Sequence, residues 1–322
     1  MTGAGSTDPV RRRRGRARPS PLPIRDGVDA TRVVLRSGPE LTVGQALLAA
    51  PALAGLTADD LGRRAAAGEI VDADGRPADL AAPSSRNVSL YLYRDLDDEI
   101  AVPFDLPVIH RDENIVVVDK PHFLATMPRG RHVTETALVR LRRELGSDTV
   151  SPAHRLDRLT AGVLLFTLRP EVRAAYQDLF ASRTARKEYL ALAPADEALA
   201  STVTVRDRIE KTAGDLRALV VDGPVNAISD ITLTEVVGGL GVYRLVPHTG
   251  RTHQLRLHMA SLGVPIVDDP LYPDVRPGLA ALPDHGDFTR PLRLVARVLE
   301  FTDPLTGVER RFESRRPVSG SG

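Results

Sequence analysis

Two uninterrupted apolar stretches place the strongest constraint on how this chain can fold. Residues 115–118 read IVVV, and residues 163–168 read VLLFTL. A strand with one face in water alternates apolar and polar side chains, so a run without alternation indicates a strand that is buried on both faces. We therefore expect these two strands to form the centre of a sheet.

Further elements are expected around this sheet. The apolar residues of 171–182 have helical spacing. Four more stretches predict strands: 187–192, 231–237, 241–246 and 292–301. Gly238, Gly239 and Gly241 mark a hairpin between two of them. Because hairpins connect most of the strands, we expect an α+β domain over residues 107–315 with a mixed, largely antiparallel central sheet.

A small N-terminal α/β module is expected over residues 29–106. Thr42 can cap a helix that runs to residue 50, and residues 58–67 predict a second helix. The remaining expected elements are two strands, 69–71 and 88–93. Two helices followed by a small sheet resemble the RNA-binding module of the ribosomal-protein S-four type.

Composition excludes several chemistries. The 322 residues include no cysteine, which excludes disulfides, thiolate metal sites and cysteine nucleophiles and suits a reducing compartment. No apolar run approaches the roughly 20 residues of a membrane span, and no glycine-rich nucleotide-binding motif occurs. We expect a cytoplasmic monomer with no membrane partner and no nucleotide cofactor.

The formal charge of +1 conceals a basic N-terminus. Residues 1–28 carry seven Arg against Asp8 and Asp26, so this tail has a charge of +5 and the rest of the chain −4. With little to bury, the tail is expected to be disordered, and residues 316–322 are expected to be flexible. The tail composition fits an arm that binds RNA phosphates or a solubilising extension, and a transit peptide is a third option.

An acidic residue stands among basic residues just before the second buried strand. Residues 154–162 read HRLDRLTAG, so Arg155 and Arg158 flank Asp157. Nearby cations favour the ionised form of a partly desolvated carboxylate, which then suits the role of nucleophile or base. Charged surface loops share this composition, so the residues alone leave simple ion pairing as the plainer alternative.

A second informative stretch, residues 248–263, reads HTGRTHQLRLHMASLG and predicts a helix. Thr252 can cap its start, and Gly263 can adopt the left-handed conformation at its end. The first turn offers unpaired N–H groups, and Arg251 adds a positive charge beside them. This end of the helix is therefore a candidate phosphate site.

Two histidines in the same stretch raise the question of a metal site. His253 and His258 are five residues apart. Zinc ligands on one helical face are typically four residues apart, as in the HExxH motif, and a spacing of five places the rings on different faces. We therefore expect no metal at this position.

Four motifs follow one another along the larger predicted domain. Residues 118–121 read VDKP, residues 187–189 read KEY, and the other two motifs are the stretches 154–162 and 249–272. All four resemble motifs of RluA-type pseudouridine synthases. Residues 118–121 resemble the family's Lys-Pro strand, and residues 187–189 its Lys-x-Tyr strand. Residues 154–162 resemble its HRLDxxTSG signature, and residues 249–272 its TGRTHQIRxHxxxxGxPIxGDxxY signature. The resemblance spans roughly residues 108–301, and four motifs with compatible spacing are much more specific than any single one.

This resemblance implies the pseudouridine-synthase fold and an isomerase that converts specific uridines of ribosomal or transfer RNA without a cofactor. It makes Asp157 the catalytic carboxylate, Tyr189 the ring that stacks on the target base, and Arg256 the cation paired with Asp157. Arg155 matches the residue that fills the RNA stack after the base has left. The RNA-binding candidates are Arg155, Arg158, Lys120, Arg251 and His253.

This chain departs from the family pattern at positions outside the three catalytic ones. The departures are Ala161 for Ser, His122-Phe123 for Ala-Gly, Val264 for His and Asp268 for Gly. They raise questions about loop shape and RNA choice. For Lys120, a structural role competes with a phosphate contact.

Two other functions compete with the isomerase. A non-catalytic RNA-binding or ribosome-assembly factor on the same scaffold would be expected to lose the catalytic residues, yet Asp157, Tyr189 and Arg256 are all present. A glycoside hydrolase also uses a carboxylate nucleophile, but it needs a second carboxyl opposite the first. Within the motifs the only further candidate is Asp269, for which we expect a structural role.

Overall fold

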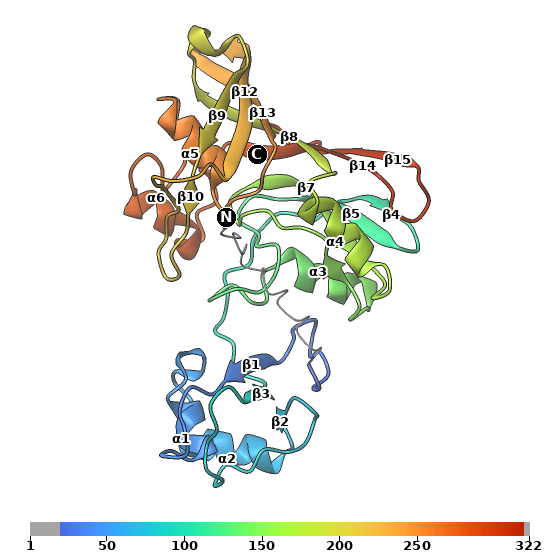
Figure 1. Cartoon of the computed structure of the whole chain (residues 1–322), viewed down its shortest axis with the longest axis vertical. Coiled ribbons are helices and arrows are strands. Elements are labelled where there is room, and N and C mark those ends of the chain that lie inside the picture. Colours follow the sequence, from blue (N-terminus) through green and yellow to red (C-terminus); the bar gives the residue numbers. More distant parts are fainter. Residues whose placement is uncertain (1–19, 319–322) are drawn as a thin grey trace, which may run out of the picture. The chain divides into compact units, whose positions relative to one another are not determined.

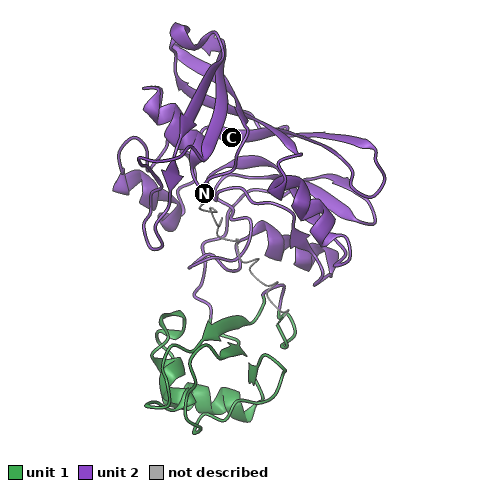
Figure 2. Cartoon of the chain, in the orientation of Figure 1, with its two compact units in different colours: residues 1–25, 29–95 green, residues 26–28, 96–322 purple. Residues whose placement is uncertain are grey.

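The computed structural model describes residues 20–318, which divide into two compact units (Figure 2). The smaller unit contains residues up to 25 and 29–95, and the larger unit contains residues 26–28 and those from 96 onward. The division at residue 95 precedes the boundary that the sequence predicted at residue 107. Most of the predicted basic tail, and the last four residues of the predicted flexible C-terminus, lie outside the described residues.

The smaller unit is a three-stranded sheet with two helices (Figure 1). The strands lie in the order β1 (Thr31–Val34), β3 (Ser89–Leu92), β2 (Ile70–Asp72), and the helices are α1 (Val43–Leu48) and α2 (Ala58–Ala66). Thr42 caps α1 as predicted, and Thr57 caps α2 in the same way. Strand β1, which precedes both helices, was not predicted.

The described end of the basic tail contacts this unit. Arg25 donates a hydrogen bond from Nη2 to Oε1 of Glu69 over 2.7 Å. Its guanidinium also lies 3.6 Å from the centre of the Tyr93 ring, a cation–π arrangement. The chain is therefore attached to the smaller unit at Arg25, several residues before the predicted end of the tail.

The larger unit is built on a ten-stranded mixed sheet (Figure 1). Its main path runs through β4 (Val108–Arg111), β5 (Ile115–Lys120), β7 (Ala161–Thr167), β14 (Leu294–Thr302), β8 (Arg186–Pro194), β13 (Leu240–Pro247), β12 (Ala227–Val237) and β9 (Val203–Asp207). Strands β15 (Glu309–Glu313) and β6 (Ser151–Pro152) pair with β14 and β7. Strands β7 and β14 are parallel, and the other neighbours are antiparallel. This topology confirms the α+β class and the mixed, largely antiparallel sheet.

Helices cover both faces of the central strands, as the apolar runs predicted. Alternate residues of β5 and β7, such as Val116 and Leu164, pack against α3 (Ala137–Leu145). The residues between them, such as Val117 and Leu165, pack against α4 (Arg173–Ala181). Because both faces are buried in this way, neither strand can tolerate polar side chains in alternation.

The helix that the sequence predicted within residues 248–263 packs on the other half of the sheet. Helix α5 (Gln254–Ser261) packs Leu255 and Met259 against β12 and β13 in one apolar cluster, and Gly263 has the expected left-handed φ of +79°. Gly238 and Gly239, with φ of +58° and +80°, form the predicted hairpin turn between β12 and β13. Two short strands, β10 (Ile209–Glu210) and β11 (Leu219–Val220), and helix α6 (Pro277–Ala281) lie on connecting segments. Within residues 20–318, no helix has the length and apolar character needed to cross a membrane.

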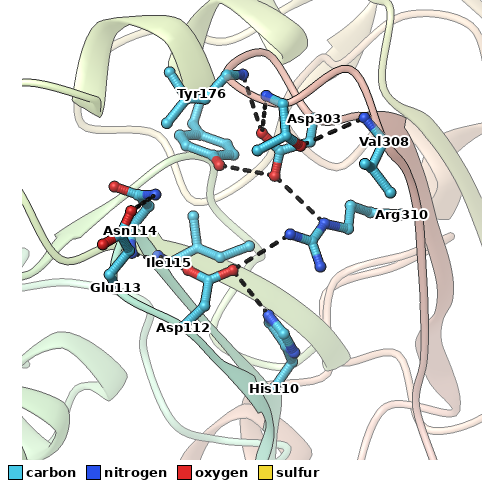
Figure 3. Close-up of polar contacts among 11 residues, drawn as sticks. His110, Asp112, Glu113, Asn114, Ile115, Tyr176, Asp303, Val308 and Arg310 are labelled. Atoms are coloured by element: carbon cyan, nitrogen blue, oxygen red, sulfur yellow. Dashed lines mark hydrogen bonds and ion pairs between the residues drawn. The ribbon is translucent and has the colours of Figure 1, made fainter.

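Two aspartates from different hairpins meet at a shared arginine (Figure 3). In each aspartate, Oδ1 accepts hydrogen bonds from two backbone N–H groups of the same turn. Arg310 lies between their other oxygens, 3.5 Å from Oδ2 of Asp112 and 3.4 Å from Oδ2 of Asp303. The Tyr176 hydroxyl donates to Asp303 over 3.1 Å, and a hydrogen bond joins His110 to Asp112. This network ties the β4–β5 and β14–β15 hairpins to helix α4.

We expect the Asp303→Asn variant to lose stability at neutral pH. Burial raises the pKa of Asp303, but hydrogen bonds from its turn and from Tyr176, with the charge of Arg310, outweigh burial and hold this pKa below its ordinary value. A carboxyl whose pKa falls on folding stabilises the fold above its unfolded pKa, and this contribution disappears as the pH falls through the folded pKa. Replacing the charged acceptor should reduce the free energy of unfolding by about 1.5–3 kcal/mol at pH 7.

Urea unfolding of the wild type and the variant at pH 7, and at steps from about pH 5 to pH 2, measures this contribution. The difference between the two proteins should shrink as the pH falls through the folded pKa of Asp303. A difference that stays constant over the whole range would show that the charge of Asp303 does not stabilise the fold.

Candidate active site

A loop held by hydrogen bonds on both sides carries Asp157. The loop connects β6 to β7. On one side, Leu156 N–H donates to Oγ1 of Thr126 over 3.1 Å, and the Thr126 hydroxyl donates back to Leu156 O over 2.9 Å. On the other side, Nζ of Lys120 donates to Arg158 O over 3.3 Å. Both neighbours of Asp157 are thus anchored, which restricts the positions that its carboxylate can take.

Gly162, the last residue of the motif 154–162, allows two strands to come together. Gly162 has a φ of +115°, and a Cβ placed on it would lie 2.2 Å from the backbone oxygen of Ala296 in β14. A side chain here would collide with backbone, which cannot move aside as a flexible side chain can. Gly162 is therefore required for the parallel pairing of β7, the strand that follows Asp157, with β14.

Strand register places Tyr189 close to the Asp157 loop. Lys120 of β5 pairs with Gly162 of β7, which pairs with Ala296 of β14. Ala296 in turn pairs with Tyr189 of β8, and Tyr189 pairs with Leu245 of β13. These residues form one row across five strands. The row brings together three of the four motifs, those that contain Lys120, Gly162 and Tyr189, although they are far apart in the sequence.

The Tyr189 side chain is partly buried and packs against two apolar clusters of the larger unit. Burial raises the pKa of Tyr189, and the negative charge of Asp157 raises it further. The phenol therefore stays protonated at neutral pH. A neutral, flat ring next to a carboxylate is suited to stacking on a base.

Arg256 of α5 is buried, and its direct partner is Asp269. Nε and Nη2 of Arg256 donate to the two oxygens of Asp269 over 2.7 and 2.6 Å, and the two side chains are 2% and 1% exposed. Burial lowers the pKa of Arg256, but the bonds to Asp269 and the charge of Asp157 outweigh burial and raise it. We expected Arg256 to pair with Asp157. In the structure Asp269 orients the guanidinium, and Asp157 interacts with it through charge.

Helix α5 begins differently from the prediction. His253 precedes the first turn with a left-handed φ of +57° and makes no capping hydrogen bond, so Thr252 is not the cap. The side chain of Gln254, the first helical residue, instead binds the segment before the helix and strand β12. Its Oε1 accepts the Arg251 N–H over 3.0 Å and the Thr249 hydroxyl over 2.8 Å, and its Nε2 donates to β12. This glutamine anchors the second motif to the sheet, a role that its helical position alone did not indicate.

The charge of Asp157 reaches several of the other candidates. It raises the pKa of Tyr189 and of Arg256, and it opposes the effect of burial at Lys120 and His253. At His253 burial dominates and lowers the pKa to about 4, so this ring is neutral at pH 7. The site therefore combines the Asp157 carboxylate with a neutral phenol ring, a neutral imidazole and a guanidinium that Asp269 holds in place.

The RNA-binding candidates differ in how they are exposed. Arg155 and Arg251 are exposed, and Arg158 is half-buried with a pKa that burial lowers. Lys120 is fully buried, and its amine donates to the carbonyl oxygens of Pro121, Leu124 and Arg158. We expected an RNA contact from Lys120. Burial argues against that contact and gives this side chain a role in holding the loop.

Two departures from the family pattern fall where the backbone is left-handed. Phe123 has a φ of +66° and Asp268 a φ of +58°, a conformation that glycine adopts without strain. The Phe123 ring is buried and lies 5.2 Å from the Phe288 ring, centre to centre. Oδ1 of Asp268 accepts two hydrogen bonds from Arg290, over 3.0 and 2.6 Å. These contacts offset the backbone strain at both positions.

Comparison with known proteins shows which family this chain matches. Residues 114–261 match the RNA pseudouridylate synthase family. The tRNA pseudouridine synthase C of Pasteurella multocida is 33% identical over 216 residues, which cover 62% of this chain and 87% of that protein. The ribosomal large subunit pseudouridine synthase D of Xylella fastidiosa is 33% identical over 233 residues, covering 67% of this chain and 68% of that protein.

Coverage is lower for longer relatives. Human pseudouridylate synthase RPUSD2 is 34% identical over 170 residues, and the match spans 31% of its length. The solved structure of human RNA pseudouridylate synthase domain containing 1 matches with 25% identity and a TM-score of 0.49, covering 66% of this chain and 85% of that one. Identity and coverage in the bacterial relatives decide the assignment: the chain belongs to the RluA-type family of RNA pseudouridine synthases, which are isomerases.

Proposed function

We propose that this chain converts specific uridines of ribosomal or transfer RNA to pseudouridine, with Asp157 as the catalytic carboxylate. The observation that carries the proposal is the meeting of three elements at one site. The loop before β7 supplies Asp157, strand β8 supplies Tyr189 and helix α5 supplies Arg256, and the charge of Asp157 acts on both of the others. We count these three as catalytic.

The reaction breaks the bond between ribose C1′ and uracil N1, turns the base and joins C5 to the same C1′. The C5 hydrogen leaves as a proton, and N1 gains a proton from solvent. No atoms are gained or lost, so no cofactor is needed. Asp157 attacks the ribose, removes a ribose proton or adds to the ring. All three routes need an ionised carboxylate that is already in place.

The target nucleotide must leave its stack before its glycosidic bond can be reached, which costs a few kcal/mol. Stacking on Tyr189 can return about 1–3 kcal/mol of that cost. We further propose that Arg155, an exposed residue two positions before Asp157, fills the space that the base leaves. Arg158, Arg251 and His253 are the further side chains that we propose for RNA contacts.

Relatives at about one-third identity act on both RNA classes, so the substrate needs an experiment. The test is release of tritium from transcripts labelled at uracil C5, using ribosomal and transfer RNA and the purified full chain. Release from one class establishes the isomerase and identifies that class. Tight binding of RNA with no release from either class would instead favour an assembly factor on the synthase scaffold.

We expect removal of residues 1–19 to weaken RNA binding chiefly at low salt. These residues carry six Arg and one Asp, whereas residues 29–95 carry seven Arg and nine acidic residues, a net charge of −2. Positive charge in the N-terminal region is therefore concentrated in the tail. For each RNA phosphate that the tail neutralises, its removal should reduce the slope of log affinity against log salt by about 0.7 for single-stranded RNA.

Filter binding at several salt concentrations, with the full chain and the truncated chain side by side, measures this slope. We expect about a tenfold difference in affinity at low salt that disappears at high salt. Equal slopes would mean that the tail does not contact RNA phosphates.

A further inference from the structure

His122 holds the far side of the Asp157 loop. Its Nδ1 lies 2.8 Å from the carbonyl oxygen of Leu159. A carbonyl can only accept, so Nδ1 must carry the proton and donate. Burial lowers the pKa of His122 to about 4, so at neutral pH the ring is uncharged and has this single tautomer.

The backbone around Asp157 is held at every carbonyl from residue 156 to residue 159. Thr126, Lys120 and His122 donate to the carbonyl oxygens of residues 156, 158 and 159, and the Asp157 carbonyl accepts the Thr160 N–H over 3.1 Å. The three side-chain donors come from the short segment 120–126, which begins at the last residue of β5. This segment and the loop therefore form one rigid assembly.

Within this assembly, His122 makes the shorter of the two side-chain hydrogen bonds on the C-terminal side of the loop. The Lys120 amine divides its hydrogen bonds among three carbonyls, and the bond to residue 158 is the longest of them at 3.3 Å. The shorter bond from His122 therefore fixes the C-terminal side of the loop. Leu159 and Tyr189 pack against the same two apolar clusters, so displacement of Leu159 would also disturb the surroundings of Tyr189.

We propose that His122 is a positioning residue for this reaction, holding Asp157 at a fixed place relative to Tyr189 and Arg256 by its hydrogen bond to Leu159. His122 acts on the loop backbone and has no direct role toward RNA. The inference rests on the proposed isomerase function. A displacement of about 1 Å at a reacting group can reduce the rate roughly a hundredfold, which sets the scale of the effect.

The test compares His122→Ala with His122→Asn, because the asparagine amide can place a donor near the position of Nδ1. We expect kcat for tritium release to fall about 10- to 100-fold in His122→Ala with KM for RNA unchanged, and His122→Asn to recover most of the loss. Tyr176→Phe serves as the control for general destabilisation, since it removes a buried hydrogen bond in the network of Figure 3 and leaves the loop intact.

Hydrogen exchange at residues 156–160 provides a readout that does not depend on catalysis. Exchange should accelerate in His122→Ala and remain slow in His122→Asn and Tyr176→Phe. Unchanged exchange in His122→Ala would overturn the proposal, as would an unchanged kcat or an equal loss of kcat in both His122 variants. No tritium release from the wild-type chain would count against the proposed function itself, and exchange would still decide whether His122 holds the loop.

Discussion

The Asp157→Asn variant is expected to lose at least about a thousandfold in the rate of tritium release while it binds RNA as well as the wild type. Asparagine keeps the size and shape of the side chain, so the loop anchored by Thr126 and Lys120 should remain folded. The asparagine amide carries no negative charge and cannot act as an anionic nucleophile or base, so the variant lacks the ionised carboxylate that all three routes require. The RNA contacts that we propose for Arg155 and Arg251 should be unaffected by this change.

Single-turnover release, together with filter binding of the same labelled RNA, separates the two effects. Asp178→Asn, an exposed acidic residue on α4, is the matched control and should retain full activity. If Asp157→Asn released tritium at the wild-type rate, Asp157 would not be the catalytic carboxylate. If the variant failed to bind RNA, its loss of activity would say nothing about the chemical step, and the assignment would have to be tested with Asp157→Ala.

The central strands were predictable because burial on two faces leaves a direct mark on the sequence. Strands β5 and β7 each present one row of side chains to α3 and the next row to α4, so apolar residues fill consecutive positions. Pattern alone therefore indicated both the strands and their central place. The β12–β13 hairpin was predictable for a different reason, because Gly238 and Gly239 supply the left-handed conformations that the turn requires.

Helix α3 was not predicted, although its signals are present. Thr136 accepts the Val139 N–H at the start, and Gly146 takes a φ of +58° at the end. Three arginines among its nine residues weaken the apolar periodicity, and one of them, Arg142, is buried against expectation for a charged side chain. The caps would have indicated this helix where its hydrophobic pattern did not.

The chemical partners of the site residues were less predictable than the residues themselves. The row from Lys120 to Leu245 depends on β14, which enters the sheet more than a hundred residues after β7 and has a register that no local pattern determines. Similarly, Arg256 and Asp269 are joined across the end of α5 by a loop whose path the sequence does not indicate. Motif resemblance identified Arg256, and geometry was needed to show which carboxylate orients it.

That pair carries the largest expected effect on stability. We expect Asp269→Asn to reduce the free energy of unfolding by about 3–5 kcal/mol, because it leaves a buried guanidinium without its bidentate anion. Asp269 also accepts the N–H groups of Leu271 and Tyr272 over 2.8 and 3.1 Å, so the loop after α5 should loosen as well. Tritium release should fall too, since Arg256 loses the group that orients it toward the site.

Urea unfolding followed by circular dichroism measures the first effect, with Glu210→Gln as the matched control. Arg208 donates two hydrogen bonds to Glu210, over 3.0 and 2.6 Å, nearly the same bond lengths as in the buried pair, but the two side chains are 31% and 53% exposed. Solvent screens such a pair, so its loss should cost less than about 1 kcal/mol. Equal destabilisation in both variants would show that burial does not determine the contribution of the Arg256–Asp269 pair. A stable Asp269→Asn variant with reduced kcat would assign Asp269 to catalysis alone, because the fold would then tolerate the unpaired charge.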